Sequence, residues 1–174
     1  PTGRSMLAVL AGLPGTGKTT VADALAGDGW RRISRDEVMP GLFGAGVKFG
    51  DPAQKEATFR EMLRRAEALL VEGRRVLLEG MPFSRRAEIE AARDLAVRVG
   101  APFRCLLCVC PDDVALARIR AQRGTHAATD RDDALYYRSQ AAFEAVTVAH
   151  RVVDTTRPVA ETIAACRAYV ERAG

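Results

Sequence analysis

The sequence predicts an α/β fold in which a parallel sheet of five strands is covered by helices on both faces, as a three-layer sandwich. Short apolar runs alternate with amphipathic stretches along the chain, and this alternation is typical of parallel sheets with helical crossovers. The 174 residues suit one ordinary domain, and no linker, repeat or low-complexity segment divides them. We therefore expect a single domain over residues 1–174.

Five short apolar runs are the candidate strands. They are MLAVLAG (6–12), WRRIS (30–34), RVLLEG (75–80), FRCLLCVC (103–110) and RVVDT (151–155). Because each run is bounded by polar residues, glycine or proline, each suits one buried strand of a parallel sheet.

Caps and prolines mark the helices between these runs. Asp51 followed by Pro52 predicts a helix start, and apolar residues then recur at helical spacing as far as Gly73. Ser84 predicts the start of a helix that runs to about Val99. Three further helices are expected: one that follows residue 18, one that starts at Pro111 and one that starts at Pro158.

The composition argues against a membrane span and gives little support to nucleic-acid binding. No apolar run approaches the ~20 residues that a membrane helix needs. The net charge of +4 comes from 23 arginines and three lysines against 22 acidic residues, with no basic run longer than two. We expect most arginines to lie on a solvated surface, nucleic acid to be a disfavoured partner, and the protein to be cytoplasmic.

Four cysteines raise the question of a metal site. Cys105, Cys108 and Cys110 lie in one apolar run, without a second cysteine pair or a nearby histidine. Cys166 falls on the apolar stripe of the last expected helix. The pattern favours buried thiols in a reducing compartment over metal ligands.

The stretch GLPGTGKT (12–19) matches the pattern G-x-x-x-x-G-K-[ST] and lies between an expected strand and an expected helix. Its glycines let the backbone wrap a phosphate, and the N–H groups of the helix N-terminus point at the phosphate oxygens. We expect Lys18 to be solvent-exposed in the empty loop and to reach the β- and γ-phosphates, and Thr19 to ligate Mg²⁺. The sequence therefore predicts an ATP and Mg²⁺ site. Its expected nucleotide-binding residues are Gly12, Pro14, Gly15, Thr16, Gly17, Lys18, Thr19 and Thr20.

The second expected strand ends at SRDE, where Asp36 is a candidate catalytic residue. Carboxyl ends of parallel strands face the ligand crevice, so this carboxylate is placed to accept the proton of an attacking hydroxyl. The alternative is that Asp36 only caps the helix that follows.

Two apolar runs end in an acidic residue. Glu79 closes the third expected strand, where it would orient magnesium through water or hold a substrate hydroxyl. Asp154 closes the fifth and is the weaker candidate.

The polar segment after the fourth strand is a candidate lid over residues 123–133. Arg123, just before Gly124, is the favoured arginine finger, because a guanidinium there would neutralise charge on the transferring group. Arg118, within the preceding helix, is either a second catalytic arginine or a structural one. We expect His126 to be exposed.

The motifs GLPGTGKTT, SRDE, LLEG, SRR and RIRAQRGT occur in this order. Together they resemble the small P-loop kinases, a group that includes phage-type polynucleotide kinase domains, zeta-toxin-like kinases and related small-molecule kinases. The resemblance covers nearly the whole chain and implies one P-loop kinase domain with a small lid and an adenylate-kinase-like strand order of 2-3-1-4-5. It also implies that Asp36 activates the acceptor and that Arg123 is the lid arginine.

Two departures from the polynucleotide kinases bear on the acceptor. Met39 replaces an arginine that those kinases use on a substrate phosphate, and Glu79, Gly80 and Met81 replace Asp-Thr-Asn. Both changes favour a small molecule with a hydroxyl group, with residues 38–50 as a mobile wall of its site. The predicted function is ATP-dependent phosphorylation of a small-molecule hydroxyl. The alternatives are a 5′-hydroxyl polynucleotide kinase and a nucleotide-gated binding module without phosphoryl transfer.

Overall fold

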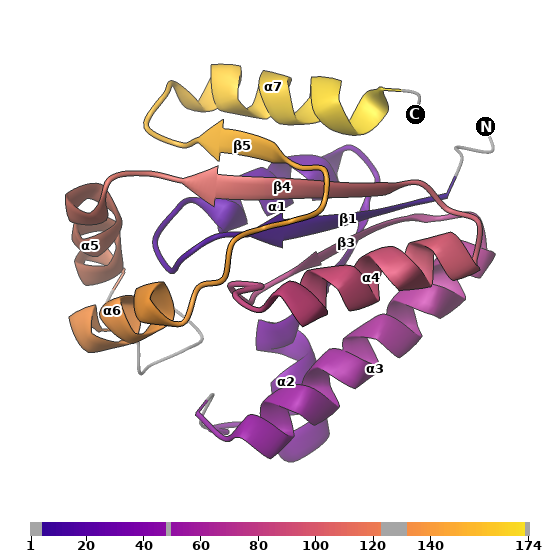
Figure 1. Ribbon diagram of the computed structural model, residues 1–174, viewed down its shortest axis with the longest axis horizontal. Coiled ribbons are helices and arrows are strands. Elements are labelled where there is room, and N and C mark those ends of the chain that lie inside the picture. The colour runs from indigo at the N-terminus through magenta and orange to yellow at the C-terminus, as the bar shows by residue number, and fades with distance from the viewer. Residues whose placement is uncertain (1–4, 48–49, 123–131, 173–174) are drawn as a thin grey trace.

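A computed structural model describes residues 5–47, 50–122 and 132–172. Its centre is a parallel sheet with the strand order β2-β3-β1-β4-β5 (Figure 1). The strands are β1 (Met6–Ala11), β2 (Arg31–Ser34), β3 (Arg75–Glu79), β4 (Phe103–Val109) and β5 (Arg151–Asp154). The expected fold class, the five strands and the 2-3-1-4-5 order are all confirmed.

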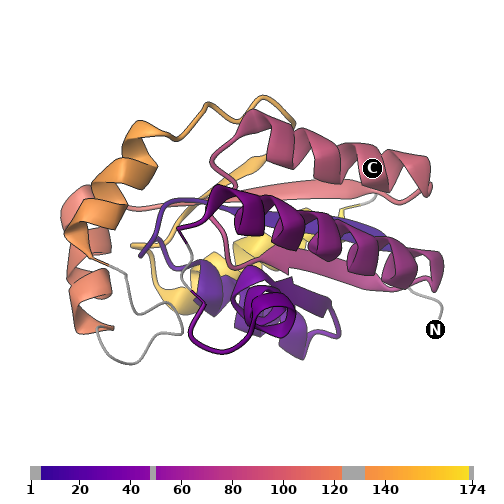
Figure 2. The same cartoon turned by 90° about the horizontal axis from the view of Figure 1, so that it is seen from below.

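Helices cover both faces of this sheet, which gives the expected three layers (Figures 1 and 2). The helices of the described residues are α1 (Lys18–Gly27), α2 (Arg35–Phe43), α3 (Pro52–Val71), α4 (Arg86–Arg98), α5 (Asp112–Ala121), α6 (Asp133–Ala141) and α7 (Val159–Glu171). Helices α1 and α7 pack together on one face, and α3 and α4 pack together on the other. Helices α5 and α6 lie beyond the carboxyl ends of the strands, at the left of Figure 1.

Alternate residues of each central strand feed two separate cores. In β1, Leu7 and Val9 pack into the core under α3 and α4, whereas Ala8 and Leu10 pack into the core under α1 and α7. All four are 0 % exposed. A strand that is buried on both faces needs no polar alternation, which explains why the sequence shows uninterrupted apolar runs.

A helix after Asp36 was considered only as an alternative, and residues 38–50 were interpreted as a mobile wall. The structure shows that residues 38–43 of this segment belong to α2. Ser34 caps the helix by accepting a hydrogen bond from the backbone N–H of Asp36 at 3.3 Å. Val38 and Met39 are buried on its inner side, and Pro40 lies inside the helix. Packing against α3 therefore outweighs the unfavourable helix propensity of Pro40.

Helix α6 was not expected, because the segment around it reads as polar. Asp132 caps it by accepting a hydrogen bond from the backbone N–H of Leu135 at 2.7 Å. The buried Tyr136 anchors it to α5, since its hydroxyl donates to Asp112 Oδ1 at 2.8 Å.

Helix α4 begins at Arg86, two residues later than the expected start at Ser84. The backbone carbonyl of Ser84 accepts a hydrogen bond from the N–H of Glu144 at 2.8 Å. The helix is instead capped by carboxylates, because Glu88 accepts from the N–H of Arg85 at 3.2 Å and Glu144 accepts from the N–H of Arg86 at 2.6 Å. A contact distant in sequence, at Glu144, thus determines a local boundary.

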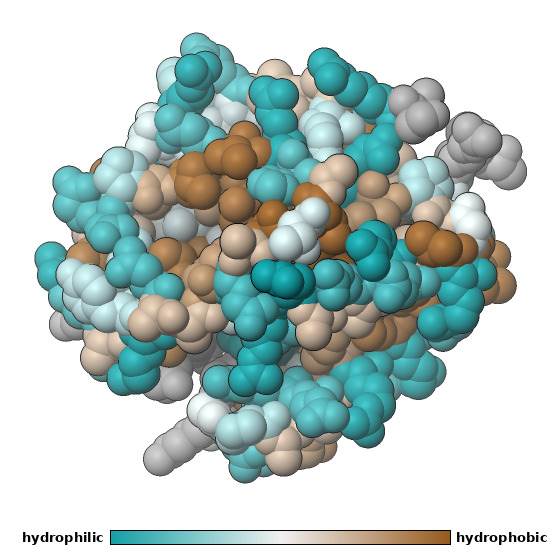
Figure 3. All heavy atoms as spheres, in the orientation of Figure 1, coloured by the Kyte–Doolittle hydropathy of each residue, from teal (hydrophilic) through white to brown (hydrophobic). Residues whose placement is uncertain are grey.

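On the face drawn in Figure 3, charged side chains are spread among apolar ones. Several exposed arginines pair with a neighbouring carboxylate, as Arg60 does with Glu56 at 3.0 Å and Arg98 with Glu67 at 3.1 Å. Within residues 5–47, 50–122 and 132–172, no helix has the length and apolar character that crossing a membrane requires.

The four cysteines are free thiols, and three of them are buried. Burial raises the pKa of Cys105 and of Cys108 to about 12, and it raises the pKa of Cys166 to about 11. Cys110 is half-buried.

We predict that Cys105, Cys108 and Cys166 resist alkylation at pH 8 in the folded protein. A thiol with a pKa of about 12 is ionised only about once in 10⁴ molecules at that pH, and the thiolate is the reactive form. Peptide mass spectrometry after iodoacetamide treatment measures the labelling, with the urea-unfolded chain as the control. Labelling of the three thiols as fast as in the unfolded chain would contradict this burial.

Candidate active site

The glycine-rich loop, residues 12–19, joins β1 to α1 at the carboxyl edge of the sheet. Its first residue, Gly12, has φ +142°, and a methyl group there would lie 2.4 Å from the carbonyl oxygen of Cys108. The N–H of Gly12 also donates to the carbonyl of Pro82 at 3.0 Å. The loop is therefore held from both sides, by β4 and by the segment that follows β3.

Lys18 does not have the solvent-exposed position that the sequence suggested. The residue is only 8 % exposed. Its Nζ donates to the carbonyl oxygens of Gly12 at 2.8 Å and Leu13 at 2.7 Å. The ammonium group bends back over the loop, where two backbone carbonyls replace water around the charge.

The two threonines that follow Lys18 begin α1 and are exposed. Thr16, in contrast, is buried and donates from Oγ1 to the carbonyl of Leu13 at 2.7 Å. Thr19 and Thr20 thus keep the accessibility that a metal or phosphate ligand needs, whereas the side chain of Thr16 stabilises the loop itself.

Asp36 lies in the first turn of α2, close to the end of β3. A methyl group on Gly80 would lie 2.5 Å from Ser34 Oγ and 3.2 Å from the backbone nitrogen of Asp36. The end of β3 therefore packs directly on the start of α2. The alternative interpretation was that Asp36 caps α2. In the structure the side chain of Ser34, the N-cap residue, has this role.

Glu79 is 2 % exposed and forms an ion pair that the sequence analysis missed. Arg32 Nε donates to Glu79 Oε1 at 2.9 Å, and Arg32 Nη1 donates to Asp23 Oδ1 at 2.6 Å. Burial alone would lower the pKa of Arg32, but the hydrogen bonds and charges of Glu79 and Asp23 outweigh it and raise that pKa. Strand alternation could have indicated this pairing. Arg32 and Ser34 lie on the same face of β2, and Ser34 is the register partner of Glu79.

This network brings Glu79 to the side of α1 that carries Thr19. Thr19 and Asp23 are four residues apart on α1 and so lie on one helix face. Arg32 joins that face to Glu79. A hydroxyl and a carboxylate are hard oxygen donors that suit Mg²⁺, which usually keeps several waters and shares substrate phosphate oxygens. The residues present therefore fit magnesium.

Arg118 contacts both the glycine-rich loop and the segment after β5. Its Nη1 donates to Thr155 Oγ1 at 2.9 Å and to the carbonyl of Gly15 at 3.4 Å. Its Nη2 donates to the carbonyl of Thr155 at 2.8 Å. These bonds support the structural interpretation of Arg118, and a direct contact with phosphate stays a prediction.

Two further groups of predicted positions are the expected lid and Asp154. Arg123, His126 and most of the expected lid lie outside the described residues. Asp154 Oδ1 accepts from the backbone N–H of Thr156 at 2.9 Å and from its hydroxyl at 2.7 Å. These hydrogen bonds lower the pKa of Asp154 and give it a local structural role.

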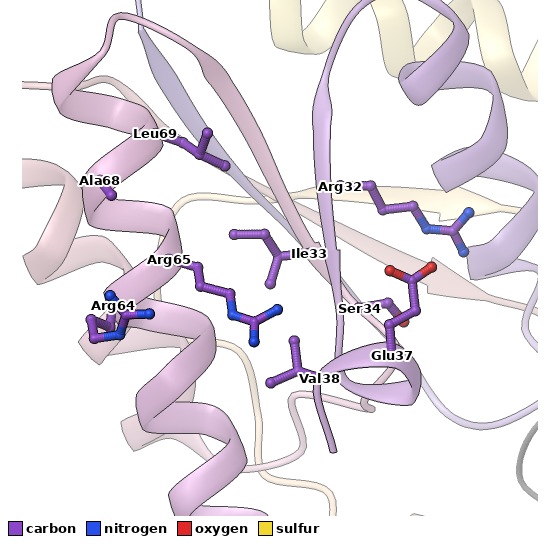
Figure 4. Close-up of a pocket in the computed structure, with 9 residues that line it drawn as sticks. All are labelled: Arg32, Ile33, Ser34, Glu37, Val38, Arg64, Arg65, Ala68 and Leu69. Atoms are coloured by element: carbon purple, nitrogen blue, oxygen red, sulfur yellow. The ribbon is translucent and has the colours of Figure 1, made fainter. Parts of the chain in front are cut away.

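A cavity of about 360 Å³ opens beside β2. Figure 4 shows Arg32 and Glu37 on one side of the strand, with Arg65 and Leu69 on the other side near α3. Its lining residues are Arg32, Ile33, Ser34, Glu37, Val38, Arg64, Arg65, Ala68 and Leu69. None of them belongs to the glycine-rich loop, and Arg32 also bonds Glu79 and Asp23.

Comparisons with known proteins identify a family and several structures with a similar fold. The sequence model of the family described as AAA domain matches residues 7–146. No curated protein sequence matches the chain significantly.

Several solved structures of kinases share the fold. A sugar kinase from Janibacter sp. HTCC2649 has a TM-score of 0.75 at 19% identity, over 96% of this chain and 95% of that one. The APS kinase of Mycobacterium tuberculosis, in complex with AMPPNP and APS, has a TM-score of 0.71 at 19% identity, over 97% and 99%. A gluconokinase from Sinorhizobium meliloti 1021 has a TM-score of 0.69 at 16% identity, over 95% and 91%. These findings confirm the predicted resemblance to P-loop kinases.

We predict that Gly80→Ala destabilises the protein more than Gly73→Ala does. Both glycines have a φ near +80°, which costs alanine about 1–2 kcal/mol. Gly73 has open space around its Cα, whereas a methyl group on Gly80 would collide with Ser34 and with the backbone of Arg35. This overpacking adds about 1–3 kcal/mol.

Urea unfolding followed by circular dichroism measures the two free energies of unfolding. Because Gly73→Ala carries only the backbone cost, it is the matched control. Equal losses in the two variants would contradict the close packing of β3 on α2.

Proposed function

Because the chain belongs to the AAA domain family, we propose that it is an ATP-dependent kinase that transfers the γ-phosphate to a hydroxyl group of a small molecule. The observation that carries the proposal is the packing of Gly80, directly after β3, against the backbone nitrogen of Asp36. The segment after β3 also accepts a hydrogen bond from Gly12 of the glycine-rich loop, at Pro82, and this supports a position of the Asp36 carboxylate near an acceptor of the γ-phosphate. The kinase structures that share the fold support the same reaction class.

The proposed reaction uses Asp36 and Lys18 in separate roles. The acceptor hydroxyl oxygen attacks the γ-phosphorus, the bond from that phosphorus to the β,γ-bridging oxygen breaks, and ADP leaves. The hydroxyl proton passes to the carboxylate of Asp36. The ammonium of Lys18 exchanges the carbonyls of Gly12 and Leu13 for phosphate oxygens.

Thr19 and Glu79 are the proposed magnesium residues, with Glu79 acting through water. Bound Mg²⁺ would neutralise charge on the phosphate oxygens. Arg118 holds α5 against Gly15 of the glycine-rich loop and against Thr155. Arg123, two residues after the end of α5 in the sequence, is the proposed arginine finger.

A small acceptor suits this chain better than a polynucleotide. Met39 is 0 % exposed and packs against Val47, so the position where polynucleotide kinases carry a substrate-binding arginine belongs to the core. Exposed arginines such as Arg60 and Arg98 are paired with carboxylates. These observations also support hydroxyl-bearing metabolites as the partners. The free cysteine thiols support a reducing compartment such as the cytoplasm.

Lys18→Ala is expected to reduce transfer to less than about one-tenth of the parental rate, because the charge on the β- and γ-phosphates is lost. The variant should also melt a few degrees lower, since hydrogen bonds from a charged group contribute about 1.5–3 kcal/mol. ADP release and calorimetry measure the two effects. Lys55→Ala, at an exposed lysine of α3, is the control and should resemble the parent. Retained transfer in Lys18→Ala would remove the loop from the mechanism.

Asp36→Asn is expected to lower acceptor-dependent phosphorylation by about 10² or more, the scale for loss of a positioned base, with little change in ATP affinity. Glu37→Gln is the matched control, because it makes the same chemical change at an exposed neighbour in the first turn of α2. ADP release with a panel of metabolites and oligonucleotides measures transfer and identifies the acceptor class.

Parental transfer by Asp36→Asn would argue against the role of this carboxylate. ATP binding without acceptor-dependent turnover in the parent would instead favour the nucleotide-gated binding module. Efficient phosphorylation of an oligonucleotide would favour the polynucleotide kinase.

A further inference from the structure

We infer that Arg32 is a positioning residue, which holds the carboxylate of Glu79 against the magnesium side of α1. The inference rests on the proposed function, because it assigns Arg32 to the same site. The guanidinium uses two different nitrogens, with Nε 2.9 Å from Glu79 Oε1 and Nη1 2.6 Å from Asp23 Oδ1. A planar fork that contacts two carboxylates at once restricts the orientation of both.

The burial of Glu79 makes this contact necessary. Only 3 % of its side chain is exposed, so water can do little to stabilise the negative charge. Removing the cation from a buried ion pair leaves a charge without compensation. Arg32 itself is 27 % exposed along its side chain, because it borders the cavity beside β2 (Figure 4). The partly exposed Arg32 is thus the cation that compensates the buried charge of Glu79.

The second contact connects Glu79 to the helix that follows the glycine-rich loop. Asp23 lies one helical turn after Thr19, on the same face of α1. By joining Asp23 to Glu79, Arg32 sets the spacing between the hydroxyl and the carboxylate that would share the magnesium. Residues of this supporting kind typically change metal affinity or activity by about 10–100-fold when they are removed.

The chain supplies its own control. Arg31 is the preceding residue of β2, is exposed, and alternates to the opposite face of the strand from Arg32. Loss of a positive charge from β2 is therefore the same in Arg31→Ala and Arg32→Ala, whereas only Arg32→Ala removes the contact with Glu79.

The test measures the binding of a fluorescent ATP analogue to the full chain, as a function of Mg²⁺ concentration and in EDTA. We expect Arg32→Ala to raise the half-saturating Mg²⁺ concentration by about 10-fold or more, while affinity in EDTA changes less than about twofold. Glu79→Gln should produce a similar shift, and the double variant should be no worse than Glu79→Gln, since residues that act through one another are not additive. Arg31→Ala should match the parent. Arg32→Lys keeps the charge without the fork, should give an intermediate shift, and replaces Arg32→Ala if that variant does not fold.

Three results would overturn the inference. The first is an unchanged Mg²⁺ requirement in Arg32→Ala when Glu79→Gln shifts it. The second is an equal loss of affinity with and without Mg²⁺, which would indicate a purely structural role. The third is an unchanged Mg²⁺ requirement in Glu79→Gln, which removes the carboxylate from the metal site. The kinase proposal survives all three if Asp36→Asn still lowers acceptor-dependent phosphorylation by about 10² or more, and it fails separately if the parent shows no acceptor-dependent turnover.

Discussion

The carboxyl edge of the sheet depends on backbone segments that pack too closely for a side-chain carbon to fit between them. Gly12 lies against the carbonyl of Cys108, and Gly80 lies against Ser34 and the first residues of α2. These contacts set where the glycine-rich loop, the end of β3 and Asp36 lie relative to one another. The backbone therefore fixes the geometry of this edge, and a side chain here can be replaced only by one that fits the same space. The close backbone packing makes this part of the site rigid.

The two buried charges at this edge of the sheet, Lys18 and Glu79, are stabilised in different ways. Lys18 is solvated by carbonyls of its own loop, whereas Glu79 is neutralised by an arginine from the neighbouring strand. The first arrangement is exchangeable, because phosphate oxygens can replace the carbonyls of Gly12 and Leu13 at similar distances. The second is fixed, because an ion pair inside the fold has no comparable substitute. In the proposed mechanism, phosphate binding by Lys18 would contribute only the difference in free energy between two sets of acceptors, and much of the affinity would come from the loop N–H groups and the helix N-terminus.

The sequence predicted the sheet, its strand order and the loop because these depend on local patterns. Apolar runs identify buried strands, and the fixed spacing of residues 12–19 identifies the loop. The sequence did not predict the extent of α2 through Pro40 to Phe43, the start of α4 or the pairing of Arg32. Each of these depends on contacts between distant residues: α3 packs on a helix that contains Pro40, and Glu144 caps α4. The burial of Lys18 was missed for a different reason, since a charged side chain bends back on its own backbone only when the loop is folded.

Helix α2 links the proposed role of Asp36 to the kind of acceptor that would fit the proposed site. Asp36 and Met39 are three residues apart and therefore neighbours on the helix, but Met39 is fully buried and packs against Val47. A cation at position 39 would have to enter that apolar contact or open it, and both cost free energy. The packing of α2 thus disfavours a cation at position 39. If Asp36 acts on the acceptor as proposed, an acceptor would find no cation at this position for a phosphodiester group, which is consistent with a small molecule that carries a hydroxyl group.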